Sequence, residues 1–187
     1  MSTWTSKLAL IAVVALAACD GFEPVTRTAP SAVMVPGDIV VTGPVGYCID
    51  EGATRLGAGE AFVLLGSCAA ITRDGAQPTP SDPTIMAVSV RSGVDVSLDE
   101  LALLFSLEGA HVPGAEASAV LETDLEPDAL FLRTNEGRAE TWRALLPVSG
   151  TLISARVLYP PEEPTAPEVA RAALDALAQA LVAANTG

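Results

Sequence analysis

The segment TWRALLPVSGTLISARVLY, residues 141–159, constrains the fold more than any other part of the chain. Two β-prone runs flank Ser149 and Gly150, which have the composition of a two-residue hairpin turn. Such a turn makes the numbers of paired residues sum to 299 and gives the hairpin one apolar face. That face carries Trp142, Ala144, Leu146, Ile153, Ala155 and Val157. The segment therefore predicts two antiparallel strands, with Pro147 at an edge or a non-bonded position.

Further β-prone runs precede this hairpin, and loops rich in Gly, Pro and Asp separate them. They are DIVVTGPVGYCID (38–50), AFVLLGSCAAIT (61–72), TIMAVSVRSG (84–93) and AVLETDLEPDALFLRT (119–134). The first contains a Gly-Pro turn between two short strands, and the second reads as a buried strand with a break at Gly66. The last reads as a second hairpin with a Pro-containing turn.

Two segments have the pattern of helices. Residues 97–109 begin with Ser97 and Glu100, the ends of a capping box, and carry an apolar stripe, although LALLFSL also fits a strand. Residues 165–185 begin with a second capping box, Thr165 and Glu168, and have one apolar face. That face carries Ala170, Leu174, Leu177 and Leu181. Together the elements predict an α+β domain with a mostly antiparallel sheet and two helices packed on one face.

The amino terminus has a different character. Lys7 precedes an apolar run over residues 8–18, which is shorter than the roughly 20 residues that a membrane-spanning helix needs. A positive residue, a short apolar run and small residues at its end are typical of a secretory signal. The sequence LAAC ends at Cys19 and is followed by polar residues, starting with Asp20. A cysteine buried in a hydrophobic helix is the structural alternative.

This stretch resembles the lipobox of bacterial lipoproteins. The resemblance implies cleavage before Cys19, a diacylglyceryl group on its thiol and fatty acylation, for instance with palmitate, of the new amino terminus. It divides the chain into a signal peptide (1–18), a lipidated tether (19–37) and one periplasmic domain (38–187). Two acyl chains are enough to hold a protein firmly on a membrane. Asp20 resembles the signal that retains enteric lipoproteins on the inner membrane.

Three segments of the domain add a second resemblance. GYCID, FVLLGSCA and the hairpin pattern TWRALL…G.LIS.RV resemble a group of uncharacterised alphaproteobacterial lipoproteins over residues 38 to 185. This resemblance implies no activity.

The charge and the motifs exclude several classes of function. The chain has a net charge of −13, which disfavours binding to nucleic acid or to anionic lipid headgroups. Neither G-x-x-x-x-G-K-[ST] nor a strand-to-helix G-x-G-x-x-G occurs, and no cofactor is expected. The only histidine, His111, lies in a loop-like GAHVPG segment without a G-x-S-x-G motif, and no metal site is expected.

The other two cysteines are Cys48 and Cys68. An oxidising compartment favours a disulfide between them, although a redox-active pair is the functional alternative. Redox dithiols usually form a C-x-x-C motif at the start of a helix, whereas both cysteines lie in strand-like sequence. The sequence therefore predicts a structural bridge.

Two charged clusters are the remaining candidates for chemistry. Glu122, Asp124, Glu126 and Asp128 alternate around one turn; they form either a solvated acidic edge or, through Glu122 and Asp124, the carboxylates of a periplasmic hydrolase. The hairpin register places Arg143 opposite Arg156 on the face away from the core. Like charges in this position are screened by water, paired with acids or hold a small anion.

These observations predict a membrane-anchored envelope lipoprotein that acts as a non-enzymatic binding module, with a protein or another envelope component as partner. A hydrolase and a small-anion-binding module are the alternatives.

Overall fold

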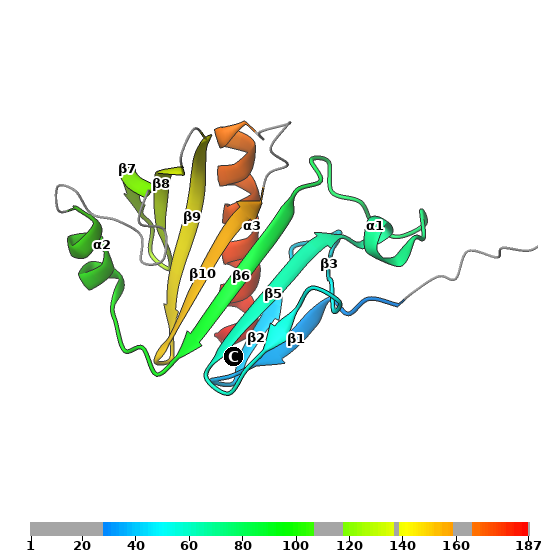
Figure 1. Cartoon of the computed structure of the whole chain (residues 1–187), viewed down its shortest axis with the longest axis horizontal. Helices are drawn as coiled ribbons and strands as arrows, with labels where there is room; N and C mark the ends of the chain where they lie inside the picture. The colour runs from blue at the N-terminus through cyan, green and yellow to red at the C-terminus, as the bar shows by residue number, and fades with distance from the viewer. Residues whose placement is uncertain (1–27, 107–117, 137–138, 159–165, 187) are drawn as a thin grey trace, which may run out of the picture.

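A computed structural model describes residues 28–106, 118–136, 139–158 and 166–186. Most of its strands form one antiparallel sheet of eight, in the order β3-β5-β6-β10-β9-β8-β7, with β4 paired to β5 (Figure 1). These strands are β3 (Tyr47–Ile49), β4 (Arg55–Leu56), β5 (Glu60–Ser67), β6 (Ile85–Ser92), β7 (Ser118–Leu125), β8 (Leu130–Glu136), β9 (Ala139–Val148) and β10 (Thr151–Leu158). The predicted α+β class with a mostly antiparallel sheet is confirmed.

The predicted hairpin register is confirmed. β9 and β10 pair from Val148 opposite Thr151 to Arg143 opposite Arg156. Ser149 and Gly150 form the turn with φ angles of 48° and 71°, the left-handed conformation that two-residue hairpin turns use. Pro147 lies beyond the last pair that β9 makes with β8, so its missing N–H breaks no bond between those strands.

One face of the sheet holds the main core. The six apolar residues predicted for the inner face of the hairpin all belong to it, together with the predicted apolar face of α3 (Pro167–Asn185). A small second sheet, β1 (Ala32–Val35) and β2 (Ile39–Thr42), packs against the same helix. The Asn185 side chain anchors the end of α3 to β2, because its amide accepts from Val40 N and donates to Val40 O, both at 2.9 Å.

The prediction that both helices pack on one face is wrong. α2 (Leu98–Ser106) packs through Leu101 and Phe105 against Leu130, Leu132 and Leu145, whereas the alternate residues Phe131 and Leu146 face α3. Successive strand residues point to opposite faces, so α2 and α3 pack on opposite sides of the sheet. In Figure 1, α3 lies behind the strands and α2 stands beside the β7 end of the sheet.

Three local differences from the sequence-based expectations are visible. The run that ends β5 turns into a short helix, α1 (Cys68–Thr72), rather than continuing as a strand. Residues 32–35, assigned to the tether, form β1 and pair with β2. Ala166 is the N-cap of α3, without a side-chain hydrogen bond; the second capping box cannot be compared, because Thr165 lies outside the described residues.

The first capping box is confirmed at the start of α2. Glu100 Oε2 accepts from Ser97 N and Ser97 Oγ at 2.8 Å, and Glu100 N donates to Ser97 Oγ at 3.2 Å. The hydrogen bond from the Ser97 backbone, followed by that from its hydroxyl, lowers the pKa of Glu100 below the ordinary value of 4.5. The ionised carboxylate is therefore the form that stabilises the beginning of the helix.

We expect the start of α2 to weaken in acid. Because the folded-state pKa of Glu100 is depressed, its contribution is present above the unfolded-state pKa and is lost as the pH falls through the folded-state value. An NMR titration of the Glu100 carboxyl carbon should give a pKa below 4.5, and amide exchange in the first turn of α2 should quicken in the same range. Glu100→Gln should remove that pH dependence. A Glu100 pKa at or above 4.5 would contradict the interpretation.

Candidate functional site

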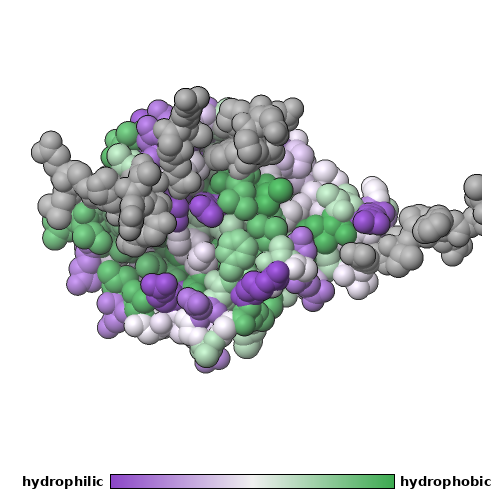
Figure 2. Space-filling model, viewed as in Figure 1, coloured by the Kyte–Doolittle hydropathy of each residue, from purple (hydrophilic) through white to green (hydrophobic). Residues whose placement is uncertain are grey.

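The face of the sheet opposite α3 contains a groove of about 790 Å³. It crosses β5, β6, β10 and β9, with β4 along one side and α2 along the other. Figure 2 looks onto this face and shows apolar side chains gathered over its middle, with hydrophilic side chains along its lower border. The groove falls within the range of 300–1,000 Å³ that is usual for small-molecule sites.

The strand register explains how polarity changes across the groove. One cross-strand row runs from Arg55 on β4 to Phe62 on β5 and then through two serines to Leu145 on β9. The serines are Ser89 on β6 and Ser154 on β10. Beyond Leu145, the wall is formed by Leu101 and Phe105 of α2. The row is therefore cationic at the β4 end and apolar at the α2 end.

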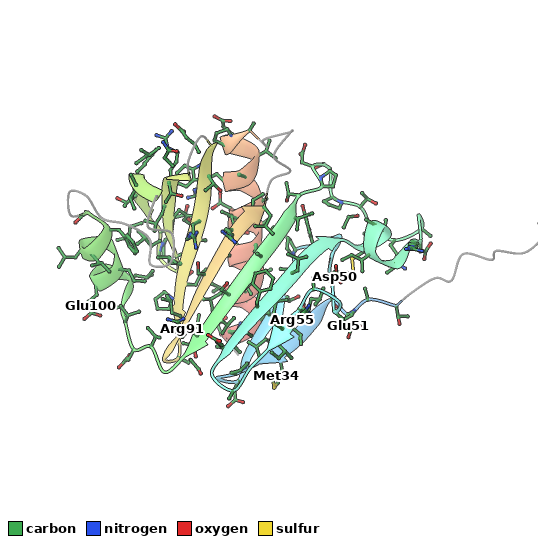
Figure 3. All side chains as sticks on the ribbon, in the orientation of Figure 1. Met34, Asp50, Glu51, Arg55, Arg91 and Glu100 are labelled. Carbon is green, nitrogen blue, oxygen red and sulfur yellow. A yellow bond between two sulfur atoms is a disulfide. The ribbon has the colours of Figure 1, made fainter. Side chains whose placement is uncertain are left out.

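A second arginine lies in the adjacent row on the same face. Arg91 is paired with Glu60 on one side and with Leu152 on the other. The side chains of Arg91 and Glu60 are 72% and 75% exposed, and their closest N–O distance is 3.9 Å. An ion pair this exposed contributes less than about 1 kcal/mol. In Figure 3 the labelled Arg91 and Arg55 both lie toward the lower end of the sheet.

The two arginines singled out in the sequence occupy the row on the other side of the serines. Arg143 and Arg156 stand directly opposite each other, as predicted, and both are half-buried on the groove face. Arg143 also lines the groove. The structure thus places Arg143 in the same groove as Arg91 and Arg55, two residues that the sequence did not single out.

The predicted disulfide is present. Cys48 of β3 is bonded to Cys68, the first residue of α1, and the two Cα atoms are 4.8 Å apart. Both cysteines are almost completely buried. The bridge fastens α1 to the edge strand of the sheet, a position that suits the structural role expected from the sequence.

The two acids considered for hydrolysis are both held in ion pairs. Glu122 Oε2 lies 2.8 Å from Arg133 Nη2, and Asp124 Oδ2 lies 2.7 Å from Arg171 Nη2. Arg171 also binds Glu126 at 2.6 Å and is paired with Asp175 on its own helix. Through these pairs Glu122 binds β8, and Asp124 and Glu126 bind α3, while all four acids remain exposed, as expected of an acidic edge.

Several predicted positions cannot be compared with the structure. Cys19, Asp20 and His111 lie outside the described residues. Within residues 28–106, 118–136, 139–158 and 166–186, no group of three or more His, Cys, Asp or Glu side chains is arranged to hold a metal ion. None of the helices in those ranges combines the length and apolar character needed to cross a bilayer.

Sequence reasoning missed most of the groove. Ser89 and Arg91 belong to β6, and β10 returns to pair with β6 after four intervening elements; Arg55 is on β4, a strand of two residues. The only available signal was the alternation in VSVRS, which marks Ser89 and Arg91 as facing away from the core. No family model, curated protein or solved structure matches the chain.

Proposed function

We propose that this protein is a membrane-anchored envelope lipoprotein whose folded domain acts as a non-enzymatic binding module. The groove on the open face of the sheet is the observation that carries the binding role, since it joins an apolar floor to a small number of charged and hydroxyl groups. The LAAC sequence at Cys19 supports the lipid anchor. The Cys48–Cys68 disulfide supports an oxidising compartment such as the periplasm.

The proposed anchor assigns a position to each part of the chain. Lipidated Cys19 would hold the protein on the periplasmic face of a membrane, and Asp20 favours the inner membrane. Residues between Cys19 and β1 would separate the domain from the bilayer. The mature chain would carry 9 arginines, no lysine and 23 acids, so adhesion to anionic headgroups would not contribute to its membrane attachment.

We expect Cys19→Ser to abolish both acylation and membrane attachment. In cells fed radiolabelled palmitate, the natural protein should carry label and sediment with membranes, because two or more acyl chains hold it there. The Cys19→Ser variant should carry none. Cys68→Ser is the matched control, because it also replaces a cysteine by serine but leaves the LAAC sequence intact. Equal labelling of the natural chain and Cys19→Ser would contradict the anchor.

The binding role is tested in the same cells with a photoreactive amino acid at Ser89, in the middle of the groove. Ser89 is exposed, so the substitution disturbs little packing. We expect crosslinks to a discrete partner from Ser89. The control position is Gln179, exposed on the outer side of α3. Crosslinks of equal yield and pattern at both positions would contradict a groove-specific role.

A further inference from the structure

The charge of the groove is opposite to that of the protein. Among its described lining residues are three arginines, Arg55, Arg91 and Arg143, and one acid, Glu60, in a chain with 23 acids and only 10 basic residues. Arginine concentrated in a partly apolar depression raises the local concentration of anions. Complementarity of charge therefore points to an anionic ligand.

The polarity gradient along the floor indicates that the ligand is also apolar at one end. Arg55 on β4 marks the cationic end of the row that crosses the floor, and Arg91 on β6 lies in the adjacent row, between Glu60 and Leu152. Leu145 and the α2 residues Leu101 and Phe105 mark the apolar end of the Arg55 row. The intervening floor consists of Phe62, Ser89 and Ser154, an aromatic ring and two hydroxyls. A ligand that lies along this row passes from a cationic contact at Arg55 to apolar contacts at Leu145 and α2, with Arg143 in the neighbouring row on β9.

Two exposed leucines bound the groove. Leu56 on β4 is 56% exposed and Leu104 on α2 is 52% exposed, and both line it. Leu104 therefore faces the groove, whereas Leu101 and Phe105 of the same helix are buried against the sheet. From β4 to β9 there are four strand spacings, or about 19 Å. That span matches one extended acyl chain better than a flat protein partner.

We infer that the groove binds a fatty acid, a single acyl chain with a carboxylate head, and this inference rests on the proposed binding role. The carboxylate lies between Arg55 and Arg91, because guanidinium groups match its planar geometry. Nη1 of Arg55 also donates to Gly52 O and Thr54 O, both at 2.8 Å, which holds this side chain in place. Arg91 exchanges its weak, exposed contact with Glu60 for the ligand. The acyl chain crosses the serines and ends against α2, where Leu145 and Phe105 remain out of water.

Photolabelling of the full-length protein in phosphatidylcholine nanodiscs tests this inference. The probe is a long-chain fatty acid with a diazirine near its methyl end, and labelled peptides are identified by mass spectrometry. We expect label on β9, β10 and α2, suppressed by unlabelled fatty acid but not by acetate. The Arg55→Gln, Arg91→Gln double variant should lose label roughly tenfold, as expected for loss of a charge-assisted hydrogen bond.

Arg73→Gln is the matched control for charge, because Arg73 is an exposed arginine that does not line the groove. Its labelling should equal that of the natural chain. The Arg143→Gln, Arg156→Gln double variant should lose less label than the Arg55→Gln, Arg91→Gln double variant. If it loses more label, the carboxylate binds at Arg143 and Arg156, and the assignment to Arg55 and Arg91 is overturned. Label that is indifferent to both double variants, or equal label from an alkyl ammonium probe, would overturn the inference. Stronger label from a lysophosphatidate probe would overturn the carboxylate assignment.

The fatty-acid inference and the proposed binding role can be overturned independently of each other. A protein crosslinked at Ser89 in cells, together with no fatty-acid label in the groove, would overturn the fatty-acid inference and support the binding module. Absence of both crosslinks and label would overturn both. Lack of palmitate on Cys19 would remove the anchor alone.

Discussion

Reduction of the Cys48–Cys68 disulfide is expected to lower the free energy of unfolding by about 3 kcal/mol. The bridge joins residues that are 20 positions apart, and closing a loop of that size restricts the unfolded chain by roughly this amount. It also fixes the edge strand β3, which pairs with β5 and holds α1 in place. Small domains are stable by only about 5–15 kcal/mol, so this loss is a large fraction of the total.

Urea unfolding of the full-length protein, with and without reductant, measures this effect. The midpoint should fall on reduction. The slope against urea should rise, because the open unfolded chain exposes more surface. The Cys48→Ala, Cys68→Ala double variant should unfold at the urea midpoint of the reduced natural protein, with or without reductant. Because this variant keeps Cys19, any remaining response to reductant would come from Cys19 and not from the disulfide. Coinciding midpoints for the oxidised and reduced protein would contradict a stabilising role.

The parts of the fold that the sequence predicts best depend on local geometry. The register of β9 and β10 follows from a two-residue turn at Ser149 and Gly150 and from the period of two along a strand. The buried face of α3 follows in the same way from the helical period, and Leu174, Leu177 and Leu181 are fully buried. In both cases a continuous stretch of the chain, the hairpin or the helix, is sufficient for the prediction.

The face of the sheet on which α2 packs does not follow from the sequence of α2 alone. The apolar stripe of α2 predicts that it packs on something, but not on which side of the sheet. The relevant signal is the run Leu130-Phe131-Leu132 on β8, which is apolar at consecutive positions and is buried on both faces. A strand of this type must be covered on both faces, so the prediction that both helices pack on one face conflicts with this signal.

Short elements and the groove depend on non-local pairing. The helix at Cys68–Thr72 was interpreted as strand because a short apolar run does not distinguish the two. Residues 32–35 form a strand only because β2 and α3 cover them. Arg143 opposite Arg156 was predictable from one hairpin, whereas Arg55 and Arg91 reach the same face through the order β5-β6-β10.

Arg171→Ala should lower the free energy of unfolding by about 3 kcal/mol. The Arg171 guanidinium lies 3.4 Å from the centre of the Phe131 ring, and its side chain is only 15% exposed. A cation over an aromatic ring in such a site contributes about 1–2 kcal/mol. Asp124 and Glu126 are about half exposed, so each of their ion pairs with Arg171 adds no more than about 1 kcal/mol.

Removal of Arg171 also leaves like charges facing one another. Asp124 and Glu126 of the β7–β8 hairpin both bind the same nitrogen of Arg171, so without the guanidinium their carboxylates repel. Added salt screens this repulsion, and the deficit of Arg171→Ala should therefore shrink as the ionic strength rises. Arg171→Lys keeps a positive charge but loses the planar group that stacks on Phe131, so its stability should be intermediate.

Arg133→Ala is the matched control for this prediction. Arg133 also contacts two carboxylates, Glu122 and Glu140, but its side chain is 34% exposed, against 15% for Arg171. Its loss should therefore be about 1 kcal/mol in urea unfolding under the same conditions. If the two alanine variants unfold at the same urea concentration, the ring contact and burial of Arg171 contribute nothing beyond an ordinary surface ion pair. A larger deficit for Arg171→Ala, reduced by salt and partly restored by lysine, would show that one side chain fastens α3 to both β8 and the acidic hairpin.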